Sequence, residues 1–184
     1  PGLLSRSVIP ASARSLCSCR LLEFLPMHAV FDGHNDVLLR LWRNSKAGAD
    51  PVAEFKNGTR EGHIDGPRAR SGGLAGGICA IYIPSGDLIL QEPDAQGHYD
   101  TPLAAPLERL PSLDIAMEKA AIALRLDQAN AWRLCRSTAD IRKAFAEDVF
   151  AAVLHMEGCE AIGADLGALE VFYAAGLRSL GPVW

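Results

Sequence analysis

A histidine and an aspartate stand two residues apart at the end of an apolar run, in the stretch VFDGHNDVLLRLW (residues 30–42). Successive side chains of an extended strand point to opposite faces, so His34 and Asp36 should point one way and Asn35 the other. An imidazole nitrogen and a carboxylate oxygen on one side suit Zn²⁺ or a similar divalent cation. The same spacing is also found in solvated polar turns, so the pair alone leaves both interpretations open.

A second carboxylate, Glu157, ends another apolar run in the stretch HMEG. An isolated buried carboxylate costs several kcal/mol, so Glu157 must be paired, neutralised or metal-bound. A salt bridge to Arg178 on the following strand is the alternative without a metal. In a parallel sheet the carboxyl ends of the strands share one edge, where barrel enzymes carry their catalytic groups. Two such strand ends with acidic or imidazole side chains favour a metal site made of His34, Asp36 and Glu157.

Apolar runs and helical spacings alternate along the chain. Strands are predicted at residues 29–36, 74–84, 149–158 and 177–184, and helices from Pro111–Ser112 to about Leu134, from Ser137 or Thr138 through Phe145, and over residues 166–176. Polar stretches at residues 43–71 and 85–111 are predicted to be long loops. Hydrophobic strands that alternate with helices are typical of parallel βαβ units with both sheet faces covered. The predicted fold class is therefore α/β.

The other histidines and the glycine-rich stretch receive simpler interpretations. His63 and His98 fall in the predicted loops, so we do not include them in the metal site. His155 shares a strand face with Glu157, and we expect it to be packed and hydrogen-bonded rather than a ligand. The glycines at residues 72, 73, 76 and 77 are not followed by the Lys-Ser/Thr of a phosphate-binding loop. Close approach of backbone to a neighbouring strand or to the metal site explains them better.

Composition limits the class of protein. The chain has 184 residues, 49% of them hydrophobic, which suffices for one domain but falls short of the roughly 250 residues of a complete β/α barrel. The net charge of −4 comes from interspersed charges without a basic stripe, which argues against a nucleic-acid partner. No apolar run approaches the roughly 20 residues of a transmembrane segment. Five scattered cysteines without a CxxC pair fit a reduced, cytoplasmic protein.

The first 26 residues differ from the rest of the chain, with three arginines, several serines and one acidic residue, Glu23. We favour upstream translated or vector-derived sequence before a start at Met27, with a transit-like peptide as the alternative. Residues 27–184 are then the folded domain. The chain ends at Trp184, at the end of a predicted strand and without a covering helix. Four strands with exposed edges would leave half a barrel, so we expect a fragment of a larger protein.

Four motifs in order resemble one known family. DGHND (residues 32–36), GGLAGGICAIYIP (72–84), HMEG (155–158) and GLRSLGPVW (176–184) look like the M19 renal or membrane dipeptidases, in particular their bacterial branch. The similarity covers about residues 29–184, the N-terminal half of such an enzyme. It implies a metal-dependent (β/α)₈ TIM-barrel hydrolase with two zinc ions, of which this chain would be the N-terminal half. His34 and Asp36 would bind one zinc and Glu157 would bridge both, while two more histidine ligands would come from strands beyond residue 184.

The resemblance implies a reaction as well. Two cations activate a water as hydroxide, which attacks the amide bond of a small dipeptide substrate. Trp184 stands where many members have a substrate-contacting histidine, and an indole donates one hydrogen bond and does not titrate. The role of this substrate-binding position, and dipeptide specificity with it, is therefore open. Two alternatives are a related metal hydrolase for lactones, phosphoesters or N-acyl amino acids, and a non-catalytic α/β binding module. A homodimer is one option for the assembly.

Overall fold

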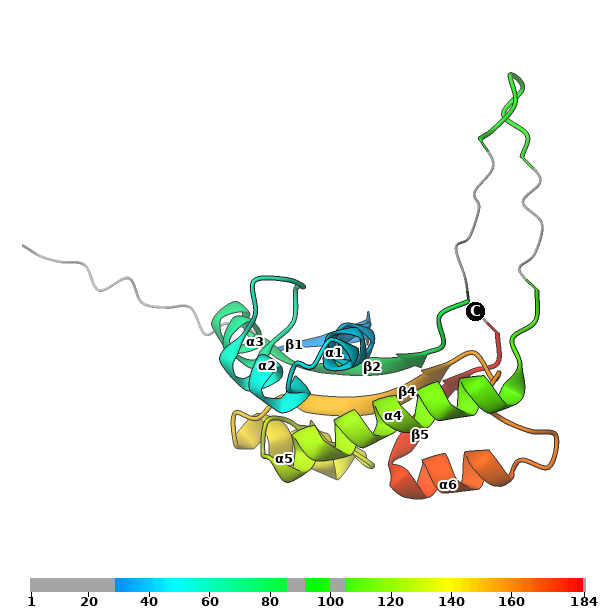
Figure 1. The fold of residues 1–184 in the computed structure, drawn as a ribbon. Helices are drawn as coiled ribbons and strands as arrows, with labels where there is room; N and C mark the ends of the chain where they lie inside the picture. Colours follow the sequence, from blue (N-terminus) through cyan, green and yellow to red (C-terminus); the bar gives the residue numbers. More distant parts are fainter. Residues whose placement is uncertain (1–28, 86–91, 100–104, 184) are drawn as a thin grey trace, which may run out of the picture.

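The computed structural model describes residues 29–85, 92–99 and 105–183, which form a mixed α/β fold with a parallel sheet (Figure 1). The predicted leader, residues 1–26, lies outside the described residues. The strands are β1 (Val30–Asn35), β2 (Leu74–Tyr82), β3 (Arg133–Leu134), β4 (Ala151–Glu157) and β5 (Leu177–Gly181). The helices are α1 (Val37–Lys46), α2 (Pro51–Asn57), α3 (Gly66–Gly72), α4 (Arg109–Gln128), α5 (Thr138–Ala146) and α6 (Gly167–Ala175).

The sheet follows the order of the chain. β1 pairs with β2, β2 with β4, and β4 with β5, and every pair is parallel. The two-residue strand β3 pairs with the first residues of β4, Ala151 and Ala152. The carboxyl ends of β1, β2, β4 and β5 therefore lie along one edge of the sheet. The four strands predicted from the sequence are these four.

Five helices, α1, α2, α3, α4 and α6, contribute to the core on one face of the sheet. Along β4, Ala152, Leu154 and Met156 are buried in the main core, which also takes in residues of α1 and α4. Of the alternate residues of β4, Ala151 is buried in a second cluster with Ala144 of α5, whereas His155 and Glu157 are only partly buried. In the described part of the chain the second face of the sheet is therefore covered by α5 near the amino end of β4 and is more open at the carboxyl end, where His155 and Glu157 lie.

An aromatic cluster closes the core near the start of β4. The ring of Phe55 lies edge-on to the rings of Trp132, at 5.5 Å, and Phe150, at 5.7 Å between centroids. Trp132 is buried, and its indole Nε1 donates to the carbonyl of Ala123 at 2.9 Å. Edge-to-face pairs of this kind stabilise a core beyond the area they bury. The cluster joins α2, α4 and the amino end of β4.

The prediction of one long loop over residues 43–71 was wrong, because this stretch contains the end of α1 and two short helices. Both short helices begin with an aspartate cap and a proline in the first turn, Asp50 before Pro51 and Asp65 before Gly66–Pro67. The Asp50 side chain accepts from the backbone N–H of Val52, which satisfies an N–H that the helix itself leaves unpaired. The aspartate caps and the prolines that follow them are visible in the sequence, but the polar, glycine-containing composition of this stretch favoured the prediction of a loop.

The helix predicted to reach about Leu134 ends earlier, at Gln128. Trp132 turns into the core after it, and Leu134 enters the sheet opposite Ala152. The other two helices agree with the prediction. Ser137 caps α5 by accepting from the backbone N–H of Asp140, and α6 ends at Gly176. None of the helices in the described part of the chain combines the length and hydrophobicity needed to cross a bilayer.

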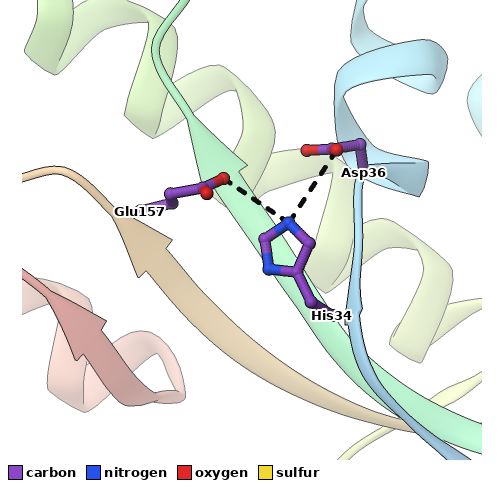
Figure 2. A group of neighbouring side chains, drawn as sticks. All are labelled: His34, Asp36 and Glu157. Atoms are coloured by element: carbon purple, nitrogen blue, oxygen red, sulfur yellow. Dashed lines mark ion pairs between the residues drawn. The ribbon is translucent and has the colours of Figure 1, made fainter. Parts of the chain in front are cut away.

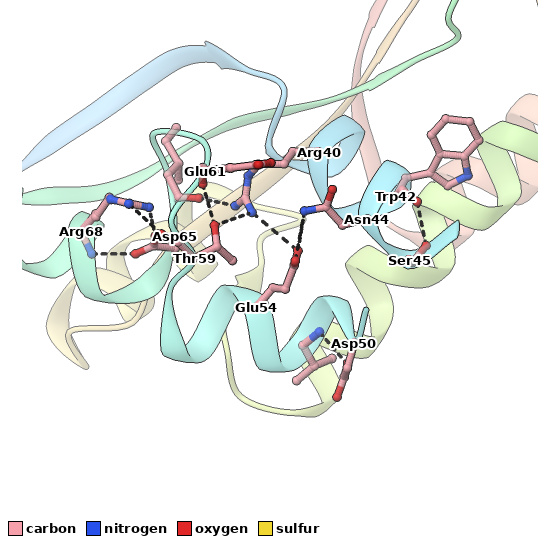
Figure 3. A network of polar contacts seen from close by, with 12 residues as sticks. Arg40, Trp42, Asn44, Ser45, Asp50, Glu54, Thr59, Glu61, Asp65 and Arg68 are labelled. Carbon is pink, nitrogen blue, oxygen red and sulfur yellow. Dashed lines mark hydrogen bonds and ion pairs between the residues drawn. The ribbon is translucent and has the colours of Figure 1, made fainter. Parts of the chain in front are cut away.

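A polar network attaches the segment around α2 and α3 to α1 (Figure 3). The guanidinium of Arg40 donates to the carbonyl of Ile64 at 2.7 Å and lies 3.6 Å from the carboxylate of Glu54. The side chain of Asn44, one turn further along α1, donates to the same carboxylate at 3.0 Å. These contacts hold the segment against α1, the helix that directly follows Asp36.

Two glycines allow the strands to pack closely. A Cβ on Gly76 would lie 2.3 Å from the carbonyl oxygen of Ala151 in β4. A Cβ on Gly77 would lie 2.8 Å from the side-chain nitrogen Nδ2 of Asn35 in β1. Real Cβ atoms essentially never approach other heavy atoms so closely. The expectation that close backbone approach explains these two glycines is confirmed.

Replacing Gly76 with alanine should destabilise the fold, because the added methyl group meets the backbone of β4 rather than a movable side chain. We expect the free energy of unfolding to fall by about 1–3 kcal/mol, the usual range for overpacking. Gly72→Ala is the matched control, since a Cβ there meets no heavy atom within 4 Å. Urea denaturation of the two variants measures the difference, and an equal effect at both positions would contradict this role of Gly76.

Candidate metal centre

The three residues predicted to bind metal meet at the carboxyl edge of the sheet (Figure 2). His34 Nε2 lies 3.8 Å from Asp36 Oδ2 and 3.6 Å from Glu157 Oε2. One ligand atom from each residue falls within 4.8 Å of the other two. Figure 2 shows the imidazole between the two carboxylates, with His34 and Asp36 on the β1–α1 segment and Glu157 at the end of β4. The sheet thus brings together residues more than 120 positions apart in the sequence.

The backbone that carries His34 and Asp36 differs from the predicted straight strand. The register of β1 on β2 is irregular between Asp32 and Asn35, which pair with Gly77 and Cys79. The advance of three residues from Asp32 to Asn35 in β1 therefore lies opposite an advance of two residues in β2, and His34 lies inside this irregularity. Such bulges commonly redirect a side chain. Asp36 is not extended: it precedes α1 with φ −102° and ψ 29°.

The Asp36 side chain is free of the capping role that its position suggests. An aspartate before a helix usually accepts a hydrogen bond from the first turn. Asp36 forms no side-chain cap bond, and its carboxylate faces His34 instead. Asn35 takes over part of that task, because its Oδ1 accepts from the backbone N–H of Val37 at 3.4 Å.

Asp32 is a supporting residue that sequence reasoning missed. Its carboxylate accepts from the Asn35 side chain at 3.0 Å and from the backbone N–H of His34 at 3.4 Å. Asn35 is buried, at 7% exposed, whereas the side chains of His34 and Asp36 are 43% and 52% exposed. The signal available in the sequence was an aspartate followed by an asparagine just before a helix, a combination that often bonds to nearby backbone.

Glu157 is placed by a sharp turn directly after it. Gly158 has φ +93°, a conformation that side-chain-bearing residues rarely adopt. Its N–H donates to the carbonyl of Gly181 at 2.9 Å, which joins the carboxyl ends of β4 and β5. The Glu157 side chain is 21% exposed, about half as much as that of His34 at 43%. It is therefore partly desolvated yet accessible.

Arg178, the partner expected for Glu157 in the absence of a metal, is engaged elsewhere. Its guanidinium donates to the backbone carbonyls of Arg136, at 2.9 Å, and Tyr173, at 2.8 Å, and stacks on the Tyr173 ring at 4.1 Å. Among the described residues, the recorded ion pairs of Asp36 and Glu157 are both with His34. In the part of the chain that the structure describes, two carboxylates thus face one imidazole without an arginine or lysine ion-paired to either.

A buried cation lies behind the site. Lys119 of α4 is fully buried, and its ammonium donates to the carbonyl of Tyr82 at the carboxyl end of β2. The ammonium also lies 5.0 Å from the centre of the Trp42 ring. Burial lowers the pKa of Lys119 to about 8, and the negative charge of Asp36 opposes that shift. Lys119 contributes positive potential near Asp36 without forming an ion pair with it.

His155 has the hydrogen bond expected of a packed histidine. Its Nδ1 lies 2.8 Å from the hydroxyl of Ser179, its register partner on β5. Burial, together with the neighbouring His34, lowers the pKa of His155, while Glu157 opposes that change. The ring is therefore neutral near pH 7.

The remaining sequence candidates lie in different surroundings. His98 is exposed and lies 3.5 Å from Asp94 within its own loop. His63 lines a cavity of about 400 Å³ together with His34 and Asp36, so the segment between α2 and α3 forms one wall of the space beside these two residues. A second cavity of about 380 Å³ lies at the opposite end of the strands and includes none of the three residues. Trp184 lies outside the described residues.

The trio fits a divalent cation by its chemistry. One imidazole nitrogen and two carboxylate oxygens form a donor set that zinc accepts, with donor distances of about 2.0–2.2 Å. Tetrahedral ligands at these distances lie about 3.4 Å apart, so the separations of 3.6 and 3.8 Å from His34 Nε2 are near those of ligands that share one ion. A cation would also neutralise the two carboxylates, which have no lysine or arginine ion pair among residues 29–85, 92–99 and 105–183.

Solved structures of metallopeptidases resemble this chain. A metallopeptidase from Rhodobacter sphaeroides, liganded with a phosphinate mimic of the dipeptide L-Ala-D-Ala, superimposes with a TM-score of 0.73 at 38% identity, over 84% of this chain and 45% of that one. The dipeptidase AC of peptidase family M19 gives a TM-score of 0.71 at 41% identity, over 84% of this chain and 42% of that one.

Sequence relatives agree. The uncharacterised protein in the PQQ-III 3'region of Acinetobacter calcoaceticus is 38% identical over 165 residues, which is 86% of this chain and 50% of that protein. The chain thus spans about half the length of this relative. The family model of the membrane dipeptidases matches residues 20–184. With these matches to both sequence and structure, the chain belongs to the membrane dipeptidases, peptidase family M19.

Proposed function

We propose that this chain is the N-terminal half of a zinc dipeptidase that hydrolyses the amide bond of small dipeptides. The observation that carries the proposal is the convergence of His34, Asp36 and Glu157 on one point at the carboxyl edge of the sheet. In parallel β/α barrels, catalytic groups occupy that edge. Membership of a dipeptidase family supports the same reaction.

The sheet supports half of a (β/α)₈ TIM barrel as the fold of residues 27–184. β1, β2, β4 and β5 pair in chain order, as successive strands of such a barrel do. One face of β4 packs against helices while the other, which bears His155 and Glu157, stays partly open. In a closed barrel the helices cover the outside and the opposite face lines the interior. Four strands and about half the length of the relatives correspond to one half of that architecture.

The residues of the chain would divide the work at the metal centre. His34 offers its Nε2 lone pair and Asp36 a carboxylate that does not cap α1, and both would hold one zinc ion. Glu157 approaches from β4 and would bridge to a second ion. The chemistry that zinc supplies in such a centre is the acidification of water and the polarisation of the scissile carbonyl. Asp32 and Asn35 keep the turn that carries the first two ligands in place.

A small substrate suits the surroundings of the trio. The adjoining cavity of about 400 Å³ falls in the size range of small-molecule sites, and His34 and Asp36 line it. The Rhodobacter sphaeroides relative holds a mimic of L-Ala-D-Ala. We therefore propose dipeptides as the substrate class, including those with a D-residue on the carboxyl side.

The chain should bind zinc, and loss of a trio residue should weaken binding at least tenfold, or about 1.4 kcal/mol. His34→Ala removes the nitrogen donor and Glu157→Gln removes one of the two negative charges. Isothermal titration with Zn²⁺ after treatment with a chelator measures both. His98→Ala is the matched control, because its exposed imidazole pairs with Asp94 outside the trio. If the parent chain binds no zinc, the non-catalytic binding module is the better description.

Peptidase activity should require more of the protein than these 184 residues. We expect a longer protein that carries this chain and the other half of the barrel to release alanine from L-Ala-D-Ala, and the 184-residue chain to release none. Chromatography of the products measures this. Hydrolysis by the 184-residue chain would contradict an incomplete site. Turnover of lactones, phosphoesters or N-acyl amino acids in preference to dipeptides would assign the longer protein to a different class of metal hydrolase.

A further inference from the structure

His155 lies beside the trio on the open face of the sheet. It precedes Glu157 by two residues in β4, so the two side chains share a face. Its register partner on β5 is Ser179, whose hydroxyl lies 2.8 Å from His155 Nδ1. This bond fixes the plane of the His155 ring, because an imidazole held at one nitrogen cannot rotate freely.

The fixed ring contacts His34. The centroids of the two imidazoles lie 6.0 Å apart and their planes meet at 80°, an edge-to-face arrangement. Aromatic pairs prefer this geometry, which makes the contact directional as well as apolar. The contact and the hydrogen bond form a chain from Ser179 on β5 through His155 on β4 to His34 on β1.

His34 has few other contacts that could hold its ring. Its side chain is 43% exposed, and its recorded polar contacts are with Asp36 and Glu157. The preceding residue, Gly33, has open space where a Cβ would lie, so the strand at this point is not packed on that side. An exposed imidazole on an irregular strand loses rotational entropy when it binds a metal ion, unless a neighbour already restricts it.

We propose that His155, anchored by Ser179, is a positioning residue that holds the His34 ring with Nε2 directed toward Asp36 and Glu157. The proposal rests on the metal centre proposed above and adds a residue to it. His155 acts through the orientation of His34 and is not itself a ligand. Neighbours that orient a metal ligand typically change metal affinity 10–100-fold when they are removed.

The test compares three variants by titration with Co²⁺, which also reports the geometry of the site through its absorption spectrum. His155→Ala removes the ring and should weaken Co²⁺ binding about tenfold and alter the spectrum. His155→Phe keeps a ring against His34 and should restore affinity to within about threefold of the parent chain. Ser179→Ala removes the anchor alone and should weaken binding by an amount between these two.

Thermal unfolding in the presence of a chelator is the control for stability, and we expect the parent chain and the three variants to agree within a few degrees. Parent-like affinity of His155→Ala, with weakened binding in His34→Ala, overturns the positioning role and leaves the metal centre intact. Equal losses in His155→Phe and His155→Ala overturn the ring contact as the cause. If His155→Ala fails to fold, parent-like Co²⁺ affinity of Ser179→Ala overturns the proposal. No Co²⁺ or Zn²⁺ binding by the parent chain overturns the metal centre and the positioning role together.

Discussion

The close parallel pairing of β1, β2 and β4 is the constraint on which the site depends. His34 and Glu157 lie on strands that do not pair with each other, so the width of β2 sets how near they come. Gly76 and Gly77 let the backbones of β4 and β1 approach β2 where a Cβ would collide. The bulge in β1 and the turn at Gly158 then direct the two side chains over the end of β2.

Two carboxylates held near one imidazole are an unfavourable arrangement without a cation, because like charges repel most strongly where water is partly excluded. The protein reduces this cost through the exposure of Asp36, with a side chain 52% exposed, and through the buried ammonium of Lys119 behind the site. It does not remove the cost with an arginine, since Arg178 is bound to backbone carbonyls. In the described part of the chain the two carboxylates are thus not neutralised by an arginine or lysine ion pair, as the proposed metal centre requires.

The sequence predicted the four main strands, the helix caps at Ser137 and Gly176, and the three residues that converge. It failed at the short helices α2 and α3, where the aspartate caps compete with a polar, glycine-containing composition. It also overran α4, because the apolar spacing continues past Gln128 while Trp132 and Leu134 belong to the core and the sheet. The spacing of apolar residues cannot show where α4 ends, since it indicates which residues are buried and not whether they belong to a helix or to a strand.

By itself the sequence determined that the strands are hydrophobic and parallel, which donor atoms His34, Asp36 and Glu157 offer, and the family to which the chain belongs. These features follow from local patterns and from four short sequence motifs. The tertiary structure decided how the donors meet. It placed Asp36 directly before a helix instead of on a strand, and it brought the Asp32 carboxylate to the backbone N–H of His34. It also set His155 between Ser179 and His34. These arrangements depend on strand register and on side-chain packing between segments distant in sequence, which no local pattern encodes.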